Sequence, residues 1–347
     1  MPQVELGVDT FGDVTVDANG NGVTQAQALR DVVAQARLAD DVGVHFFGVG
    51  EHHRADFAIS APEVVLSAIA SVTTRIRLGS AVTVLSSDDP VRVFQRFSTL
   101  NALSHGRAEV ILGRGSFTES YPLFGFDLAQ YEELFEEKLN LFAELLKGGP
   151  IAWQGTLRSL PLRADAIYPP VENGPLKTWV AVGGSPQSVV RAAYYGLPLM
   201  LAIIGGSPQR FRPYVDLYLE SLERFSKSPQ PIGVHSPGHV AGTDEQAREE
   251  LWPHFAGLMN RIGAERGWQP IGRAHFEREA GPDGALFVGA PETVAAKIVR
   301  TVTALGLQRF DLKYSSGTLP HDALMKSLEL YGTQVMPLVQ EALATRR

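Results

Sequence analysis

The sequence predicts an α/β fold in which one chain of 347 residues closes a (β/α)8 barrel, the TIM-barrel architecture. Short apolar runs alternate with longer stretches of helical periodicity from one end of the chain to the other. These runs are apolar almost throughout, which is typical of parallel strands covered on both faces. An open doubly wound sheet is the alternative, but no G-x-G-x-x-G pattern begins the chain. We therefore expect a single domain over residues 1–347.

Eight apolar runs are the predicted strands. They are Val4–Phe11, Val44–Val49, Ile76–Leu85, Ala108–Leu112, Lys177–Val182, Pro198–Ile204, Ile232–Ala241 and Arg309–Lys313. Nearly all of the segments between them are long enough to return the chain to a parallel neighbour, which takes a dozen or more residues.

The stretches with helical spacing of apolar residues are the predicted helices. They are Gln25–Asp41, Ala61–Thr74, Asp89–Ser104, Leu128–Leu146, Pro186–Tyr195, Pro208–Arg224, Glu245–Asn260, Glu292–Leu305 and Asp322–Leu343. Pro62 and Pro90 stand in first turns, where a missing backbone N–H costs nothing, and Gly106 follows a helix end.

Two segments interrupt the alternation and are expected to be loop insertions, at about 148–175 and 261–288. Within the first, Ile151–Pro170 is irregular and rich in proline, with room for a small hairpin. Within the second, Arg261–Gly284 shows no clear periodicity and is rich in Gly, Arg and His. Neither has the composition of a linker between domains.

Composition excludes several classes of protein. The chain has no cysteine, which excludes disulfides, thiolate metal sites, iron–sulfur clusters and a cysteine nucleophile. Its net charge is −7 without a cluster of Lys and Arg, so no nucleic-acid partner is expected. We find no apolar run of membrane-spanning length and no signal-peptide pattern, and therefore expect a cytoplasmic protein without a membrane partner.

The first candidate for chemistry is Glu51-His52-His53, directly after the second predicted strand. Reactive groups of such barrels lie at the C-terminal ends of the strands. The motif could hold a metal, form a solvated loop or face a ligand. Adjacent strand residues point to opposite faces and the HExxH pattern is absent, so we predict no metal site. We favour a ligand-facing His52 that donates a hydrogen bond or acts as acid/base, because imidazole titrates near neutral pH.

Two further strand ends could bind an anion. Arg114 lies between Gly113 and Gly115, where the backbone can approach a ligand, although the guanidinium could instead pair with an acid such as Glu119. Gly183-Gly184-Ser185-Pro186-Gln187-Ser188 begins a helix, whose free N–H groups attract anions. An ordinary Ser-Pro cap is the alternative there. His235 and His239 share a strand face and are more simply a polar lining than ligands.

Four segments together resemble the bacterial luciferase-like flavin-dependent monooxygenases. In order along most of the chain they are FFGVGEHHRADF, IRLGSAVTVLSSDDPVRVFQRFSTLNALSHGRAEVILGRG, VAVGGSPQSVVRAAYYGLPLMLAII and FVGAPETVAAKIVRTVTALGLQRFDL. The run from DPVR through SHGR to GRG is the most specific of them.

The resemblance implies an FMN-type flavin across the C-terminal mouth of the barrel, with His52 beside its reactive edge and Glu51 in support. It implies a cis peptide bond between Ala81 and Val82 under the flavin ring, and a mobile lid over Arg261–Gly284. The implied phosphate ligands are Arg114, Gly115, Gly183, Gly184, Ser185 and Ser188.

The same resemblance implies that reduced FMN, supplied by a separate flavin reductase, and O2 oxidise a small organic substrate such as an aldehyde or ketone. It also implies a homodimer formed through the helices Ala61–Thr74 and Asp89–Ser104. Three alternatives stay open: an F420-dependent hydride-transfer enzyme, a non-catalytic flavin-binding protein and a divalent-metal barrel hydrolase.

Three departures from the family pattern shape these expectations. Gly184 replaces an acidic residue beside the phosphate turn, which predicts a phosphate contact that is looser or made by the backbone alone. Gly113 replaces a cysteine of the luciferases, which argues against light emission. The loop Gly12–Thr24 is longer than in luciferases, which predicts a differently shaped substrate pocket.

Overall fold

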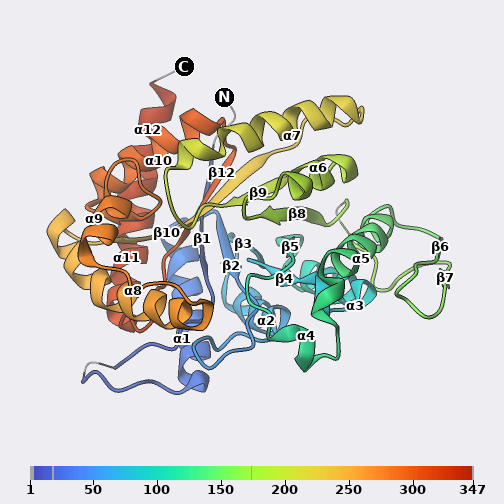
Figure 1. Ribbon diagram of the computed structural model, residues 1–347, viewed down its shortest axis with the longest axis horizontal. Helices are drawn as coiled ribbons and strands as arrows, with labels where there is room; N and C mark the ends of the chain where they lie inside the picture. The colour runs from blue at the N-terminus through green and yellow to red at the C-terminus, as the bar shows by residue number, and fades with distance from the viewer. Residues whose placement is uncertain (1–3, 18, 173, 346–347) are drawn as a thin grey trace.

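The computed structural model describes residues 4–17, 19–172 and 174–345; Ala18 of the predicted N-terminal loop and Asn173 of the first predicted insertion lie outside them. Eight parallel strands form a closed barrel with helices around it (Figure 1). The order of neighbours is β1-β2-β3-β5-β8-β9-β10-β12, and β12 pairs again with β1. This confirms the predicted TIM-barrel class.

The barrel strands overlap all eight predicted strands. They are β1 (Glu5–Thr10), β2 (Phe46–Val49), β3 (Arg77–Ser80), β5 (Ala108–Gly113), β8 (Lys177–Val182), β9 (Leu199–Ala202), β10 (Ile232–Val240) and β12 (Arg309–Lys313). Their outward side chains pack against the helices in one large apolar cluster, which includes Leu6, Val110 and Phe310.

The helices are α1 (Gln25–Asp41), α2 (Pro62–Val72), α3 (Pro90–Leu103), α4 (Ser120–Leu123), α5 (Tyr131–Leu145), α6 (Pro186–Tyr195), α7 (Arg212–Arg224), α8 (Asp244–Arg266), α9 (Arg273–Ala280), α10 (Pro291–Leu305), α11 (His321–Leu330) and α12 (Met336–Ala344). Most helices begin and end close to the predicted positions, whereas α4 and α9 were not predicted and α8 ends later than predicted.

Capping residues explain several of these boundaries. The Asp89 side chain accepts hydrogen bonds from the backbone N–H groups of Val91 and Arg92, at 2.9 and 3.0 Å, and starts α3. Gly306 ends α10 with a φ of 69°, a conformation that side chains disfavour. Within the described ranges, no helix combines the length and the apolar character needed to cross a bilayer.

Two elements predicted as continuous are interrupted. The third strand, predicted over Ile76–Leu85, is divided into β3 and β4 (Thr83–Val84), and the peptide bond between Ala81 and Val82 is cis. The last helix, predicted over Asp322–Leu343, contains a π-helical turn at Tyr331–Val335. Apolar periodicity does not indicate either break, because buried apolar residues stand on both sides of each one: Leu78 and Val84 at the first, Leu330 and Met336 at the second.

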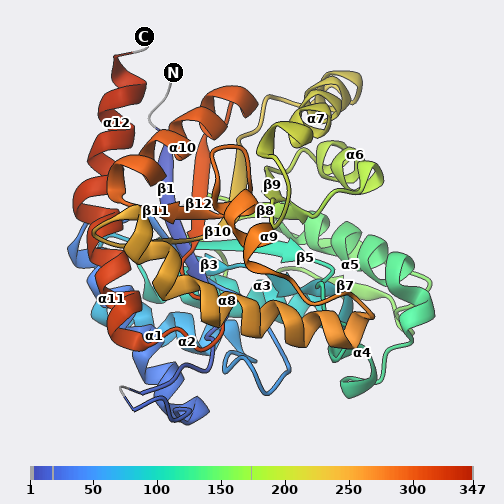
Figure 2. The same cartoon turned by 60° about the vertical axis from the view of Figure 1, so that its left-hand side comes forward.

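The first insertion contains the expected hairpin, formed by β6 (Ile151–Trp153) and β7 (Leu162–Ala164). The prediction of an irregular loop at 261–288 is wrong. That segment holds the end of α8, the whole of α9 and β11 (Phe287–Gly289), which pairs with β10. Figure 2 shows α8 and α9 lying over the strands, so their apolar side chains do not follow the single stripe of a barrel helix.

A buried ionic network fills the N-terminal end of the barrel. The guanidinium of Arg309 is fully buried and donates to Glu109 Oε2 at 2.6 Å and to both carboxylate oxygens of Asp311 at 2.9 Å. It lies 3.4 Å from the centre of the Phe46 ring. Arg77 and Lys177 contact the other oxygen of Glu109, at 2.6 and 3.1 Å.

The network keeps Glu109 ionised inside the protein. Burial alone would raise its pKa, but Arg309, Arg77 and Lys177 together lower it to about 2. Burial raises the pKa of Asp311 to about 6 in spite of the neighbouring Arg309. The barrel interior at this end therefore contains charges that neutralise one another.

We predict that Arg309→Met lowers the free energy of unfolding by about 3–5 kcal/mol, because it leaves Glu109 buried without one of its two nearest cations. Urea unfolding followed by circular dichroism measures this change. Arg212→Met is the control, since Arg212 is half exposed in a surface pair with Asp216 and should change stability by less than about 1 kcal/mol. Equal effects of the two variants would contradict this account of the network.

Candidate functional site

The C-terminal end of the barrel, here called the mouth, has a floor of very small side chains. Strand alternation from the buried interior cluster places one small residue on each of five neighbouring strands: Gly48, Ala81, Gly113, Ala181 and Ala202. A Cβ atom on Gly48 would lie 2.9 Å from that of Ala81, and one on Gly113 would lie 2.7 Å from a methyl group of Val82. Larger side chains would not fit at these two positions, and we call the five residues the small-residue floor.

Glu51 ties the loop after β2 to the backbone beyond the cis peptide bond. One carboxylate oxygen lies 2.9 Å from His53 Nε2, and the other accepts the backbone N–H of Val84 at 2.8 Å. The backbone N–H of Glu51 also donates to the carbonyl of Val82, at 3.1 Å. Glu51 is buried and fully engaged, so it supports the wall of the mouth.

His52 lies in a cluster of aromatic rings, here called the aromatic box, formed by Phe11, Phe57 and Phe117. The ring centres are 4.4, 4.6 and 5.3 Å from that of His52. Burial lowers its pKa to about 3, and the charges of Lys313 and Arg54 act in the same direction. The burial of His52 therefore favours a neutral ring that donates or accepts a hydrogen bond over the acid/base role of an imidazole that titrates near neutral pH.

A second histidine belongs to the mouth, on the opposite wall. His235 Nδ1 lies 2.7 Å from a carboxylate oxygen of Asp9, and the imidazole is stacked near the ring of Phe11, 6.1 Å between centres. His239 has a different partner, since its Nε2 lies 2.8 Å from Glu250 of α8. The two histidines therefore do not converge on one ligand.

Arg114 pairs with Glu132 of α5 and not with Glu119, which contacts Arg54 instead. Its guanidinium lies 5.0 Å from the centre of the Tyr131 ring. The second oxygen of Glu132 is 3.3 Å from Arg191 Nη2. One carboxylate thus lies between two guanidinium groups, in the position that an anionic ligand would take.

The start of α6 adds backbone and hydroxyl groups to this place. Ser185 caps the helix by accepting the backbone N–H of Ser188 at 3.4 Å. The hydroxyl of Ser188 is buried and has no hydrogen-bond partner among the described residues. Gly184 has a φ of 125°, and its carbonyl accepts the hydroxyl of Tyr214 at 2.8 Å. We call Arg114, Ser185, Ser188 and Arg191 the anion site.

Sequence reasoning missed Arg191. It lies on α6 three residues after Ser188, and residues three apart on a helix are neighbours on its surface. Extending the search by one helical turn beyond the Ser185–Ser188 pair would have found it. Its Nη1 is also buried without a partner in the described part of the chain.

An open groove of about 910 Å³ adjoins the anion site. Arg191 and Glu132 belong both to the groove and to the contacts just described. Three more glutamates of α5 line it, together with Trp153 and Tyr195; these glutamates are Glu133, Glu136 and Glu137. The space beyond the anion site is therefore strongly acidic.

The second half of α8 covers the aromatic box. Leu258 and Ile262 are buried against Phe57, with Phe11 and Phe117 beside them. This contact explains why α8 continues far beyond Asn260, its predicted end. The apolar residues of this part of α8 pack against the aromatic box at the mouth and not against a neighbouring barrel helix.

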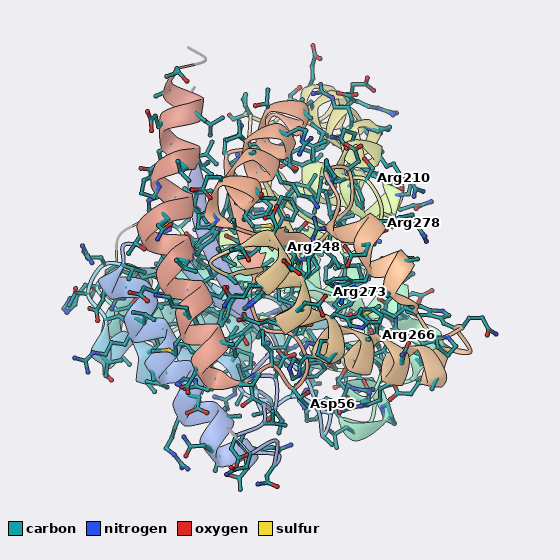
Figure 3. All side chains as sticks on the ribbon, turned by 90° about the vertical axis from the view of Figure 1, so that its left-hand side faces the viewer. Asp56, Arg210, Arg248, Arg266, Arg273 and Arg278 are labelled. Carbon is teal, nitrogen blue, oxygen red and sulfur yellow. The ribbon has the colours of Figure 1, made fainter. Side chains whose placement is uncertain are left out.

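Ionic contacts hold the end of α8 to two strand loops. Arg54 contacts Glu119, Asp56 and Glu265 of α8, the last at 2.5 Å. Arg261 contacts Asp56, and Arg266 donates to the carbonyl of Ser116 at 2.7 Å. Figure 3 shows Arg266 at the end of α8 and Asp56 beneath that helix.

The N-terminal loop Gly12–Thr24 forms another wall of the mouth through Asp13. Ser315 and the backbone N–H of Gly317 donate to its carboxylate at 2.5 and 2.7 Å, and Lys313 Nζ lies 3.2 Å away. A β-bridge joins Asp13 to Phe57 of the aromatic box. The long loop is thus fixed between the last strand and the box.

The sequence is similar to one protein family and to individual relatives within it. The sequence profile of the family described as Luciferase-like monooxygenase matches residues 10–309. An N-acetyl-S-alkylcysteine monooxygenase of Bacillus subtilis (strain 168) is 32% identical over 226 residues, 64% of this chain. Uncharacterized protein y4wF of Sinorhizobium fredii is 32% identical over 185 residues, 52% of this chain. The matches span 63% and 52% of these two relatives.

Solved structures share the fold at low sequence identity. Monooxygenase RslO1 of Streptomyces bottropensis superposes with a TM-score of 0.83 at 21% identity, covering 96% of this chain and 99% of that one. The oxygenating constituent of 3,6-diketocamphane monooxygenase of Pseudomonas putida, in complex with FMN, gives 0.78 at 18% identity, covering 97% and 98%. An F420-dependent secondary alcohol dehydrogenase gives 0.75 at 16%, covering 97% and 99%.

We predict that Arg54→Met loosens the end of α8, because Glu265 then loses its cation. Amide hydrogen exchange over 258–266 should become about three- to tenfold faster, as expected for losing surface ion pairs. Arg273→Met is the matched control, since Arg273 bonds Glu249 and Glu277 where α9 meets α8. It should affect α9, and unchanged exchange at 258–266 in the Arg54 variant would refute the role of Arg54.

Proposed function

This chain belongs to the luciferase-like monooxygenase family, and from that premise we propose that it uses reduced FMN and O2 to oxygenate a small, mainly apolar organic substrate. The observation that supports a phosphate-bearing cofactor is the buried hydroxyl of Ser188, which has no hydrogen-bond partner among the described residues. A phosphate would supply an acceptor for this hydroxyl and for Arg191 Nη1, which also has none in the described part of the chain.

The mouth suits the rest of a flavin. The small-residue floor has room for a flat tricyclic ring, and Gly113 and Gly115 allow the backbone beside Arg114 to approach it. Binding of the phosphate requires Glu132 to leave Arg114, which its exposed position on α5 permits. The phosphate would then be held by Arg114, Ser185 and Ser188, with backbone N–H groups following Gly183 and Gly184.

Reduced FMN, when bound, supplies the electrons for activation of O2. The residues of this chain would keep water away and orient the substrate. His52, neutral in its aromatic box, would share a hydrogen bond at the reacting edge without carrying a charge into it. Leu258 and Ile262 of α8 would close the mouth during the reaction.

The mouth favours a substrate whose reacting part is uncharged. Phe11, Phe57 and Phe117 offer apolar surface, and the two nearest cations are already neutralised. Lys313 is bound by Asp13, and Arg54 is bound by three carboxylates. An aldehyde, ketone or thioether group would fit this surface without leaving a charge unpaired.

The acidic groove favours FMN over F420. F420 continues beyond its phosphate into a tail with additional carboxylates, whereas FMN ends there. Glu133, Glu136 and Glu137 line the space next to the anion site. Arg191 offsets the charge of Glu136, and backbone N–H groups contact Glu137, but the remaining negative charge would repel such a tail. An F420-dependent enzyme is the alternative that cofactor titration separates from this proposal.

Three parts of the proposal concern the surroundings of the enzyme. We propose that a separate flavin reductase supplies the reduced FMN. We propose a homodimer through α2 and α3, where Val64 and Leu103 are 70% and 61% exposed. The cytoplasmic location stays a prediction from the sequence.

Arg114→Met should weaken FMN binding about ten- to a hundredfold, because a charge-assisted contact to phosphate is lost. Ser188→Ala should weaken it about three- to tenfold. Fluorescence titration with FMN and with F420 measures both, and Arg212→Met, remote from the site, should bind like the parent protein. Tight binding of F420 with no binding of FMN would overturn the choice of cofactor.

His52→Ala should keep FMN binding and lose about a hundredfold in turnover, because the neutral hydrogen-bonding group at the reacting edge is gone. Product formation is followed by mass spectrometry under ¹⁸O2 with a flavin reductase, using a long-chain aldehyde, a cyclic ketone and an N-acetyl-S-alkylcysteine as substrates. His52→Gln keeps a hydrogen-bond donor and should retain more turnover than His52→Ala. Full turnover in the alanine variant would refute the assignment.

A further inference from the structure

The two histidines of the mouth lie on different sides of one phenylalanine ring and have opposite surroundings. The centre of the Phe11 ring is 4.4 Å from that of His52 and 6.1 Å from that of His235. His52 is surrounded by aromatic rings, whereas His235 has a buried carboxylate at 2.7 Å. The chemistry available to the two imidazoles is therefore different.

We infer that His235, oriented by Asp9, is the group that takes up and returns the substrate's proton at the mouth, while His52 stays neutral. This inference rests on the proposed function, because it assigns a role within the same site. His235 would be the catalytic residue of the step and Asp9 its positioning residue.

Asp9 decides which nitrogen of His235 carries the hydrogen. A carboxylate only accepts hydrogen bonds, so Nδ1 must be the protonated nitrogen in the contact with Asp9 Oδ2. The lone pair of the neutral ring is then at Nε2, which has no hydrogen-bond partner among the described residues. The His235 side chain is 12% exposed, which leaves a ligand in the mouth a way to reach it.

The groups that face His235 differ from the aromatic rings around His52. On β1 it faces Asp9, whose other oxygen is buried and unpartnered in the described structure. On β12 its register partner is Asp311, with Lys313 two residues further along, where Asp13 offsets its charge. On β9 its register partner is Ala202, which does not titrate. Beyond Phe11 lies the neutral His52.

The proposed step moves one proton and no electrons. A bond from hydrogen to oxygen, nitrogen or carbon of the substrate breaks, and its electron pair stays on the substrate. A new N–H bond forms at Nε2, and the resulting imidazolium is stabilised by the carboxylate of Asp9. The proton returns to the product from Nε2, so the histidine is regenerated.

His239 shows that a histidine paired with a carboxylate is not by itself enough to identify a catalytic residue. It lies on the same strand, and its Nε2 is 2.8 Å from Glu250, so it is also a histidine paired with a carboxylate. Its side chain is fully buried and its partner belongs to α8, away from the barrel interior. Of these two pairs, only that of His235 belongs to the mouth, which makes His239 a matched control.

Nitrogen NMR of ¹⁵N-histidine-labelled full-length protein tests the inference without any substrate. Signals are assigned with His235→Gln, His52→Gln and His239→Gln. We expect neutral His235 to carry its hydrogen on Nδ1, held there by Asp9, and its Nε2 to give the signal of an unprotonated nitrogen. Hydrogen on Nε2 of neutral His235 would overturn the inference.

Turnover provides the second test. His235→Ala should lose about a hundred- to a thousandfold in kcat, the usual contribution of acid–base catalysis, with FMN binding changed less than about twofold. Added imidazole should restore part of kcat, which it does not do for a purely structural loss. Asp9→Asn should lower kcat and shift its pH profile, and His239→Gln should keep both. Full kcat in His235→Ala, or a loss that imidazole does not relieve, would contradict the inference.

The two tests separate this inference from the proposed function. If the parent protein binds no FMN and forms no oxygenated product, the proposed function fails, and the NMR experiment still decides which nitrogen of His235 carries the hydrogen. If FMN binds and product forms but His235→Ala is fully active, the proposed function stands and the inference fails.

Discussion

The contact between Arg309 and Glu109 fixes the rest of the structure. It joins β12 to β5 across the barrel interior, and Arg77, Lys177 and Asp311 bring three further contacts to the same place. A buried ion pair tolerates little displacement, because each partner left alone is a charge without solvent. The N-terminal end of the barrel interior is therefore filled by these paired charges.

The two sides of the barrel contribute different kinds of residue to the mouth. The strands from β2 to β9 contribute glycine and alanine, whereas β1, β10 and β12 contribute Asp9, His235 and Lys313. Small residues make room, and the polar ones face that room from one side. A flat ligand would thus meet an apolar support on one face and groups able to hold a proton near the other.

Apolar periodicity predicted the barrel, its eight strands and most of its helices, because nearly all of these elements are covered on both faces or along one stripe. It could not predict the end of α8 or α9, whose partners lie at the mouth. The motifs predicted Glu51, His52, Arg114 and the Ser185–Ser188 turn. They could not predict how the side chains pair: Arg114 meets Glu132, and His235 meets Asp9, through contacts 18 and 226 residues apart.

The anchoring of Asp13 has a consequence for how the mouth is made. Its partners Lys313, Ser315 and Gly317 follow it by about 300 residues. A ribosome releases Asp13 long before β12. Asp13 and the aromatic box, which a β-bridge joins to it at Phe57, therefore cannot reach their final arrangement during synthesis. The reactive end of the barrel is completed only when the last strand closes it, and a nascent chain therefore carries no working site.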